Sequence, residues 1–412
     1  MCLIRLFTIR KICSFLNSLN QLIKTSFLLF SFQMGDCFAR YDFLDHSYDT
    51  DERFQSICKQ LCAHNMWIRS VLIFAPKQKV DDVFYDKLIV TCGDDETLKL
   101  WNIPEGKNIS KFRLGFMMNC LEELNYTEND VEKQHFIIGG EQGKLIVYDY
   151  ATNTVLKDLV GSNRNILCIK VLPNKKNPTS KHSIIVTSNS RGEVRFWDWQ
   201  KGLTIHRIRH GIQPVQGLCV WEHLPFGQST PFRMIVNSYE HKVNVWSPGS
   251  KSIRKIKQFA EHTNWVRSVV CRTVQDTRSQ NEVRMPTASM LVSAGDDNTI
   301  RFFNIRNGNC LRILQTHSSG IIYMEMFKNN LISCESCGRI AVTQLEDMKT
   351  YYIATGLSFD YYKGLSVKQD EDKNEAYLGV VGSSPKRSSY HFLNIYRGKV
   401  VGQNMVFDVP QG

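Results

Sequence analysis

The side chains in this sequence that could do chemistry together are histidines, hydroxyls and carboxylates. They recur in two similar sets, His64, Thr91, Asp95 and His262, Ser293, Asp297. A histidine between a hydroxyl and a carboxylate can activate a nucleophile, and histidine with carboxylate can bind a metal. The sequence contains no G-x-S-x-G, G-x-x-x-x-G-K-[ST], H-E-x-x-H or G-x-G-x-x-G motif. The elements that hold these residues must therefore decide between a chemical and a structural role.

Those elements are hairpins that recur along the chain. Each has a β-branched arm, a polar or glycine-containing turn and a second alternating arm, which is typical of antiparallel strands. Six are evident, at Leu88–Ile103, Phe136–Tyr150, Ile184–Trp199, Met234–Ser247, Leu291–Ile305 and Leu331–Gln344. Their alignment gives one column, spaced by 47, 49, 49, 57 and 40 residues, at Trp101, Tyr148, Trp197, Trp246, Phe303 and Thr343. Units of this length bury both sheet faces only against neighbours, which predicts an all-β propeller.

Seven blades are predicted. A seventh unit lies in Gly356–Val401, and Arg53–Leu61 has the pattern of a lone outer strand. Residues 53–400 divided by seven give about 50 residues per blade, a usual repeat length. We expect the N-terminal strand to complete the last blade, because this closes the ring and leaves no open sheet edge.

The units resemble WD40 repeats. In that family a His before the first strand, a Ser or Thr in the second, an Asp in the turn and a Trp in the third are hydrogen-bonded together. The resemblance implies a structural tetrad of His64, Thr91, Asp95 and Trp101. It also implies a second one, without the indole link, of His262, Ser293, Asp297 and Phe303. The other units keep parts of the pattern: Thr187 and Trp197 with Arg191, Trp246 with His210 and Glu240, His317 and Ser333 with Cys337, and Tyr148 with Asp149.

Tryptophan and arginine occur together before the inner strands of units one and five. His64–Val71 is HNMWIRSV and His262–Val269 is HTNWVRSV. These positions resemble the partner contacts on the top face of WD40 proteins, and Trp and Arg are enriched at binding hot spots. The predicted protein-binding residues are Trp67, Arg69, Asp94, Trp265, Arg267 and Asp296, with Tyr361 and Lys363 from the seventh unit. The alternative is that both Trp rings pack between blades and both Arg side chains pair with the turn acids.

The excess of basic over acidic residues is concentrated in two of the repeat units. The chain has 412 residues and a formal charge of +11, from 51 basic and 40 acidic residues. Much of the excess falls in units three and four, at Lys175, Lys176, Arg207, Arg209, Arg254, Lys255 and Lys257. Such a flank could contact RNA, acidic lipid or an acidic protein, but outer strands are commonly charged, and no exposed aromatics for base stacking interleave with it.

Another partner is suggested by Val292–Arg306. The segment resembles the box by which some WD40 proteins dock on the cullin-4 adaptor as substrate receptors of a ubiquitin ligase. Phe303, Asn304 and Arg306 fit its last positions. The box overlaps the general repeat consensus, so a match occurs easily by chance.

The first 33 residues differ from the rest, with four basic and no acidic side chains. They fit either a mitochondrial presequence or an upstream extension, with Met34 as the start. We expect residues 34–52 to be a linker, 53–401 the propeller and 402–412 a tail. The uncharged stretches are too short for a membrane span. Thirteen scattered cysteines indicate reduced thiols in an intracellular, cytoplasmic or nuclear protein, or a mitochondrial one if the presequence is genuine.

The sequence therefore predicts a non-catalytic scaffold that binds proteins or peptides within a multi-subunit complex. Its surfaces would be the top face and two long bottom loops, Pro76–Asp86 and Arg272–Ala288. No catalytic residue, metal or cofactor is expected. The ubiquitin-ligase receptor and a propeller associated with RNA or acidic lipid are the alternatives.

Overall fold

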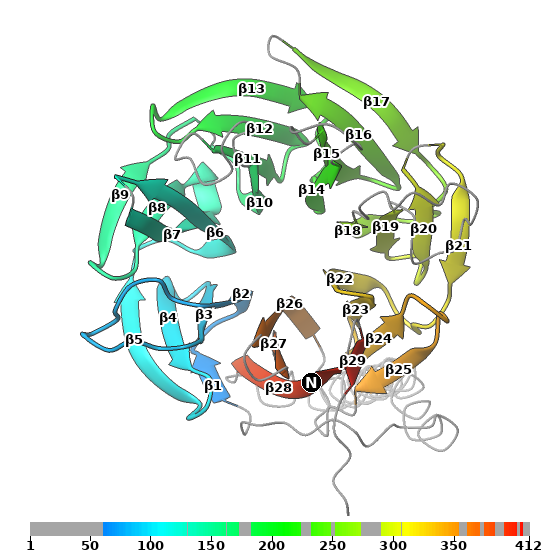
Figure 1. The fold of residues 1–412 in the computed structure, drawn as a ribbon. Helices are drawn as coiled ribbons and strands as arrows, with labels where there is room; N and C mark the ends of the chain where they lie inside the picture. Colours follow the sequence, from blue (N-terminus) through cyan, green and yellow to red (C-terminus); the bar gives the residue numbers. More distant parts are fainter. Residues whose placement is uncertain are drawn as a thin grey trace, which may run out of the picture. The chain divides into compact units, whose positions relative to one another are not determined.

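The computed structural model forms a ring of antiparallel sheets (Figure 1). It describes residues 61–129, 131–161, 163–172, 183–223, 232–248, 252–272, 290–305, 307–353, 361–370, 375–383, 391–401 and 404–406. All of these belong to the compact unit Asp51–Gly412. The sheets number seven in this part of the chain, and in six of them the first strand lies innermost. The predicted all-β, seven-bladed propeller is confirmed.

Blades 1 to 6 each have four strands that run in chain order from the inside of the ring to the outside. Blade 1 has β2 (Ile68–Phe74), β3 (Leu88–Gly93), β4 (Thr97–Asn102) and β5 (Lys107–Arg113). Blade 2 has β6 (Met118–Glu128), β7 (Val131–Gly140), β8 (Leu145–Asp149) and β9 (Thr154–Asp158), with one short helix, η1 (Glu141–Gly143). Blade 3 has β10 (Ile166–Leu172), β11 (Ile184–Asn189), β12 (Glu193–Asp198) and β13 (Leu203–Arg209).

The next three blades repeat this order. Blade 4 has β14 (Leu218–His223), β15 (Phe232–Tyr239), β16 (Lys242–Pro248) and β17 (Ile253–Phe259). Blade 5 has β18 (Val266–Arg272), β19 (Met290–Gly295), β20 (Ile300–Asn304) and β21 (Cys310–Leu314). Blade 6 has β22 (Ile321–Phe327), β23 (Asn330–Glu335), β24 (Ile340–Gln344) and β25 (Thr350–Ile353).

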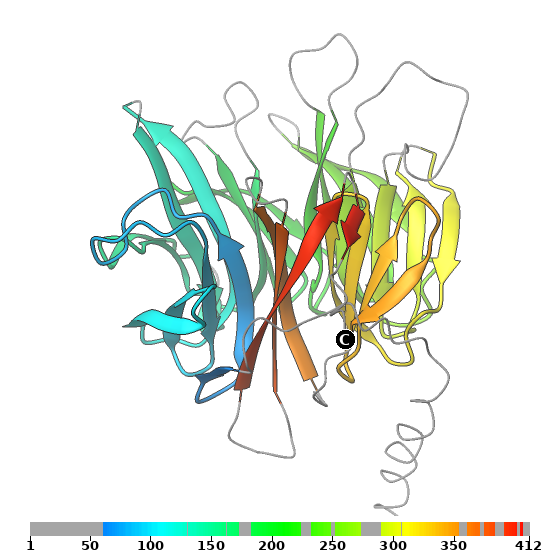
Figure 2. The same cartoon turned by 60° about the horizontal axis from the view of Figure 1, so that its bottom comes forward.

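Blade 7 combines both ends of the propeller. Its inner strands are β26 (Tyr361–Asp370), β27 (Glu375–Ser383) and β28 (His391–Val401), and its outer strand is β1 (Leu61–His64). Figure 2 shows β28, in red, next to the blue strands that begin the chain's described part. The predicted closure by an N-terminal strand is confirmed: the described strand is Leu61–His64, and residues 53–60 of the predicted strand lie outside the described part. The predicted tail contributes β29 (Asn404–Val406), which pairs with the end of β28.

The core consists of seven apolar clusters within the described residues, and each joins two neighbouring blades. In the cluster between blades 2 and 3, Ile137 packs with Trp197. The second strands β3, β19 and β23 are buried along their whole length, because a blade covers each of their faces. The cluster that joins blades 7 and 1 contains Ala63 of β1, so the closing strand also supplies core.

One backbone hydrogen bond recurs at the same edge of six blades. The turn between the second and third strand donates an N–H to the loop that enters the inner strand, at 2.8–3.0 Å. The pairs are Asp94 to Trp67, Glu141 to Met117, Ser190 to Asn165, Ser238 to Gly217, Asp296 to Trp265 and Ser336 to Gly320. Contact is so close that a Cβ on Gly93 would lie 2.1 Å from the Trp67 carbonyl oxygen. These loops and turns together are called the top surface below.

Candidate functional site

The predicted tetrad of blade 1 is fully formed. The indole Nε1 of Trp101 donates to the Thr91 hydroxyl at 2.9 Å, and that hydroxyl lies 2.8 Å from Nε2 of His64. Nδ1 of His64 lies 2.8 Å from the Asp95 carboxylate. Since the Thr91 oxygen accepts the indole proton, its own hydrogen points to Nε2, and the neutral Nδ1–H tautomer of His64 donates to Asp95. Thr97 also donates to Asp95, at 2.7 Å from its hydroxyl.

The electrostatics of this network agree with a neutral imidazole. Burial lowers the pKa of His64, and the bond to Asp95 only partly offsets that effect. Burial alone would raise the pKa of Asp95, but hydrogen bonds from His64 and Thr97 hold it well below its ordinary value. At neutral pH the carboxylate is therefore charged and fully engaged with internal donors.

Blade 5 has the same network without its last link, as predicted. Nε2 of His262 lies 2.7 Å from the Ser293 hydroxyl, and Nδ1 lies 2.8 Å from Asp297. Phe303 is buried and packs on Phe259 in a tilted arrangement, with ring centroids 4.7 Å apart and an interplanar angle of 43°. Packing of the two rings replaces the indole hydrogen bond here.

Blade 6 corrects the predicted pattern. His317 contacts the Ser333 hydroxyl at 2.7 Å as expected, but Cys337 does not take the place of the acid. The buried carboxylate of Glu335 does, 3.3 Å from Nδ1 of His317, and it also accepts the backbone N–H of Ser318 at 2.9 Å. Glu335 stands in the strand where blade 1 has Gly93, and its longer side chain reaches the imidazole from there.

The remaining blades form different polar contacts. In blade 3, Trp197 donates to Thr187 at 2.9 Å, while Arg191 at the acid position is exposed. In blade 4 the acid position is again not used: Trp246 donates to Asn237 at 2.8 Å, and Asn237 lies 3.1 Å from His210. Glu240, predicted there, makes no such contact.

The hydroxyl groups that contact the three histidines are buried. Thr91, Ser293 and Ser333, whose hydroxyls contact the three imidazoles, are completely buried, whereas a nucleophile must be reached by its substrate. Within the described ranges, no group of three or more His, Cys, Asp or Glu side chains is placed to hold a metal ion.

The Trp–Arg pairs of the top surface have the same geometry in blades 1 and 5. Arg69 donates from Nε to Asp94 at 2.8 Å, and its guanidinium lies 5.9 Å from the centre of the Trp67 ring. Arg267 binds Asp296 in the same forked way, 5.9 Å from the Trp265 ring. The arginines thus pair with the turn acids, as the alternative prediction held. Both arginine side chains remain about one third exposed, and both Trp residues are partly exposed.

The sequence did not predict a series of apolar side chains on the same surface. Four consecutive loops that enter inner strands each expose a large apolar residue, between 38% and 82% of its area: Met66, Met117, Val160 and Ile212. They lie in the loops before β2, β6, β10 and β14. Met66 and Met117 come one or two residues before an inner strand, whereas Val160 and Ile212 come two and three residues after an outer strand. An apolar residue in each of these connecting loops was the signal in the sequence that could have identified them.

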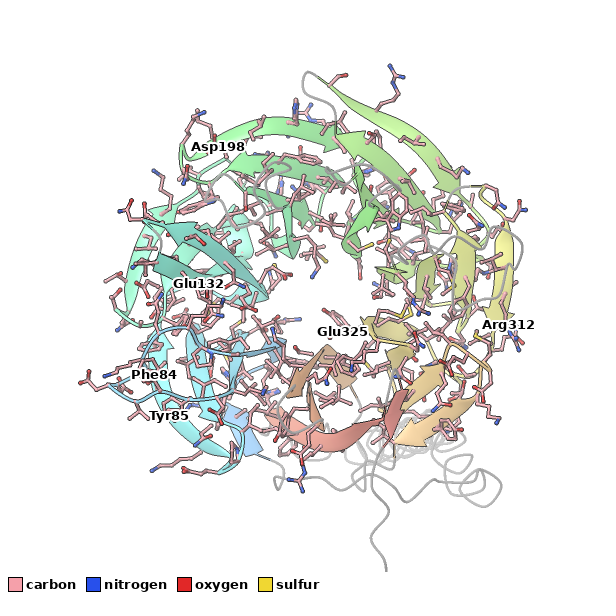
Figure 3. All side chains as sticks on the ribbon, viewed as in Figure 1. Phe84, Tyr85, Glu132, Asp198, Arg312 and Glu325 are labelled. Carbon is pink, nitrogen blue, oxygen red and sulfur yellow. The ribbon has the colours of Figure 1, made fainter. Side chains whose placement is uncertain are left out.

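Charged residues also gather on the inner strands. The Lys170 ammonium lies 2.6 Å from the Glu122 carboxylate, and Glu325 comes from the far side of the ring, where Figure 3 labels it beside the central opening. Burial raises the pKa of Glu325 to about 8, although the hydrogen bond from the backbone N–H of Val367 and the charge of Lys170 both lower it. Among the described residues, Lys170 and Glu122 are thus paired with each other, and Glu325 accepts a backbone N–H.

The predicted basic flank divides into separate parts. Lys175 and Lys176 lie outside the described residues. Arg254 and Lys255 of β17 are exposed, and Lys257 is partly buried against Gly308. Arg207 and Arg209 of β13 both turn to Glu193 instead.

The remaining predicted site residues have mixed outcomes. In the cullin-type box, Phe303 is buried, and the Asn304 side chain accepts the backbone N–H of Asn307. Arg306 and the side chains of Tyr361 and Lys363 lie outside the described part of the chain.

The first long bottom loop is held against blade 2. Gln134 of β7 is completely buried and accepts the Lys77 backbone N–H at 3.0 Å, while its amide donates to the Ala75 carbonyl. The tip exposes 70% of Phe84, which Figure 3 shows at the rim of the ring. Most of the second predicted loop, residues 273–289, lies outside the described residues.

Comparison with known proteins agrees with this geometry. The family model for the WD domain, G-beta repeat matches residues 55–102 and 253–304, which contain the two predicted tetrads. The curated protein "DENN domain and WD repeat-containing protein SCD1" of Arabidopsis thaliana is 22% identical over 266 residues. That match covers 64% of this chain but only 19% of the relative. In the residues that the structure describes, no helix is long and apolar enough to cross a membrane. The two matched segments are WD40 repeats that carry the His–Ser/Thr–Asp network, and they lie within a ring of seven antiparallel sheets.

Proposed function

We propose that this propeller is a non-catalytic scaffold that binds protein segments through its top surface. The observation that carries the proposal is the repeated Trp–Arg–Asp arrangement of blades 1 and 5. In each, an internal carboxylate fixes the guanidinium beside a partly exposed indole. A preorganised Arg next to an aromatic ring offers directed donors and apolar area together, at little entropic cost on binding.

The apolar residues of the top surface support a protein partner over a nucleic acid. Met66 directly precedes Trp67, and Met117, Val160 and Ile212 continue the series over the following loops. Single exposed apolar residues are ordinary, but a series on one edge of consecutive blades is typical of an interaction surface. Apolar side chains gain little from a phosphate backbone and much from a peptide.

The burial of the histidine networks supports the non-catalytic part of the proposal. Their hydroxyls are inaccessible, and their carboxylates are engaged by internal donors. The fold thus devotes these residues to holding loops in place, and the held loops form the proposed binding surface.

The experiment is affinity purification of tagged protein, with quantitative mass spectrometry of what it retains. The test variant carries Trp265→Ala and Arg267→Ala. The matched control is Phe84→Ala, which removes an exposed aromatic from the opposite edge of the ring. We expect the test variant to lose the main partner at least tenfold while the control keeps it, with both melting within about 3 °C of wild type. Equal retention by the two variants would contradict binding through the top surface, and a large loss of stability in the test variant would mean that the pair packs and does not bind.

A further inference from the structure

Three arginines of blade 3 converge on a single glutamate. Glu193 of β12 accepts Arg195 Nη2 at 2.9 Å and Nε at 3.1 Å, and it is also bound by Arg207 Nη2. Nε of Arg209 lies 3.5 Å away. No second carboxylate in the described part of the chain lies within ion-pair distance of these three guanidinium groups. The cluster therefore holds a surplus of two positive charges.

Strand register places the three side chains on one face of the blade. In the ladder between β12 and β13, Arg195 lies opposite Arg207 and Glu193 lies opposite Arg209. The amide of Asn189 donates to the same carboxylate at 3.2 Å, which fixes Glu193 from the other side. The guanidinium groups are thus ordered before any ligand arrives.

The cluster is graded in exposure. The side chains of Arg195, Arg207 and Arg209 are 11%, 36% and 67% exposed, so the arginines lead from the blade to solvent. Burial and then the charge of Arg209 lower the pKa of both Arg195 and Arg207. Glu193 neutralises one of the three positive charges, and a further anion would relieve the repulsion between the other two.

Blade 1 shows that this convergence is specific to blade 3. It carries basic residues at the same three register positions, Lys99, Lys111 and Arg113. With Thr97 in place of the glutamate they separate: Lys99 donates to the Ala63 carbonyl, and Arg113 pairs with Glu96 at 3.0 Å. A basic outer strand alone does not make the cluster; Glu193 does.

We propose that Arg195, Arg207 and Arg209 form a binding site for a phosphate monoester carried on a peptide segment of a partner protein. A phosphate monoester carries about two negative charges and three acceptor oxygens, which match two surplus positive charges and forked guanidinium donors. A nucleic-acid backbone offers one charge per phosphate and gains its affinity from many spaced contacts. A peptide also suits the surroundings, because Leu203 and Ile205 are exposed on the same strand. The site is separate from the Trp–Arg pairs of the proposed scaffold surface.

The probe is a pool of randomised nine-residue peptides with a central phosphoserine, compared with the same pool carrying serine. Retention by immobilised full-length protein is measured by mass spectrometry. We expect wild type to retain the phosphorylated pool at least tenfold more than the serine pool. Arg207→Ala with Arg209→Ala should abolish that preference.

The matched control removes two charges from the same register positions of blade 1, with Lys111→Ala and Arg113→Ala, and should keep the preference. Since loss of two partners could disturb Glu193, the single variant Arg209→Gln keeps Arg195 and Arg207 on the glutamate and should still lose at least threefold. No preference in wild type, or equal loss in the blade 1 control, would overturn the proposal.

Two further arms distinguish the source of the phosphate. One offers single-stranded RNA, and the other offers phosphatidylcholine vesicles containing phosphatidylinositol 4-phosphate. Binding that depends on Arg207 and Arg209 in either arm, without a preference for the phosphoserine pool, would replace the peptide with nucleic acid or membrane and refute the proposal as stated.

Discussion

Blades 1 and 3 have the same four-stranded topology and the same Trp–Thr hydrogen bond, but they differ at the positions of the His and the Asp. In both, a tryptophan indole donates to a threonine hydroxyl at 2.9 Å, Trp101 to Thr91 and Trp197 to Thr187. In blade 1 the threonine continues to His64 and Asp95, so its polar groups are satisfied internally. In blade 3 the acid position is the exposed Arg191, and nearby charge gathers on Glu193 instead.

The comparison indicates that the blade keeps the Thr–Trp hydrogen bond, whereas the His–Asp pair can be replaced. The Thr–Trp bond is buried in both blades and joins the second strand to the third. The His–Asp half lies at the top edge, where it fixes the turn, and the turn can be held in another way. In blade 3, which lacks the His–Asp pair, Asn189 accepts the backbone N–H groups of Arg191 and Glu193 and so holds the turn.

Much of this could be predicted from the sequence, because it depends on local pattern. The six hairpins, the seventh blade and the tetrads of blades 1 and 5 follow from strand alternation and residue spacing. Closure by an N-terminal strand was predicted too, and the described closing strand begins at Leu61, the last residue of the predicted one.

Other contacts depend on side-chain length and strand register, which the spacing of residues in the sequence does not give. Alignment placed Cys337 opposite His317, but the longer Glu335 reaches the imidazole from two residues earlier. Similarly, Arg207 and Arg209 belonged to a general basic flank in the sequence. Only the register between β12 and β13 places both beside Glu193.

The largest predicted effect contrasts the two acid positions directly. Asp95→Ala removes the acceptor for His64 and Thr97, and we expect it to lower the free energy of unfolding by about 1–3 kcal/mol. Arg191→Ala, at the equivalent position of blade 3, should change it by no more than about 0.5 kcal/mol. Urea unfolding measures both. Equal losses would show that the two blades do not differ as described.

A smaller effect tests the Trp–Thr hydrogen bond that blades 1 and 3 have in common. Thr187→Val removes only the acceptor of Trp197, and should cost about 1 kcal/mol in the free energy of unfolding. Thr91→Val also removes the partner of His64, and should cost about 1 kcal/mol more. Measured side by side, identical losses would indicate that the His64 contact contributes nothing.

The smallest effect is a dependence on pH. Because the pKa of Asp95 is lower in the folded than in the unfolded protein, its stabilisation is complete above about pH 4 and is lost as the pH falls further. Asp95→Asn should therefore be less stable than wild type at pH 7, with a difference that shrinks below pH 4. Thermal melting from pH 7 to pH 3 checks this, with Arg191→Gln as the control that follows wild type. A constant difference across that range would refute it.

The most direct test of the structural role is a double-mutant cycle between His64 and Asp95, from urea unfolding of His64→Ala, Asp95→Ala and both. If the two side chains form one internal network, the losses are not additive, and the coupling free energy is about 1 kcal/mol or more. Additive losses, to within about 0.3–0.5 kcal/mol, would contradict the central claim that these residues stabilise the blade together.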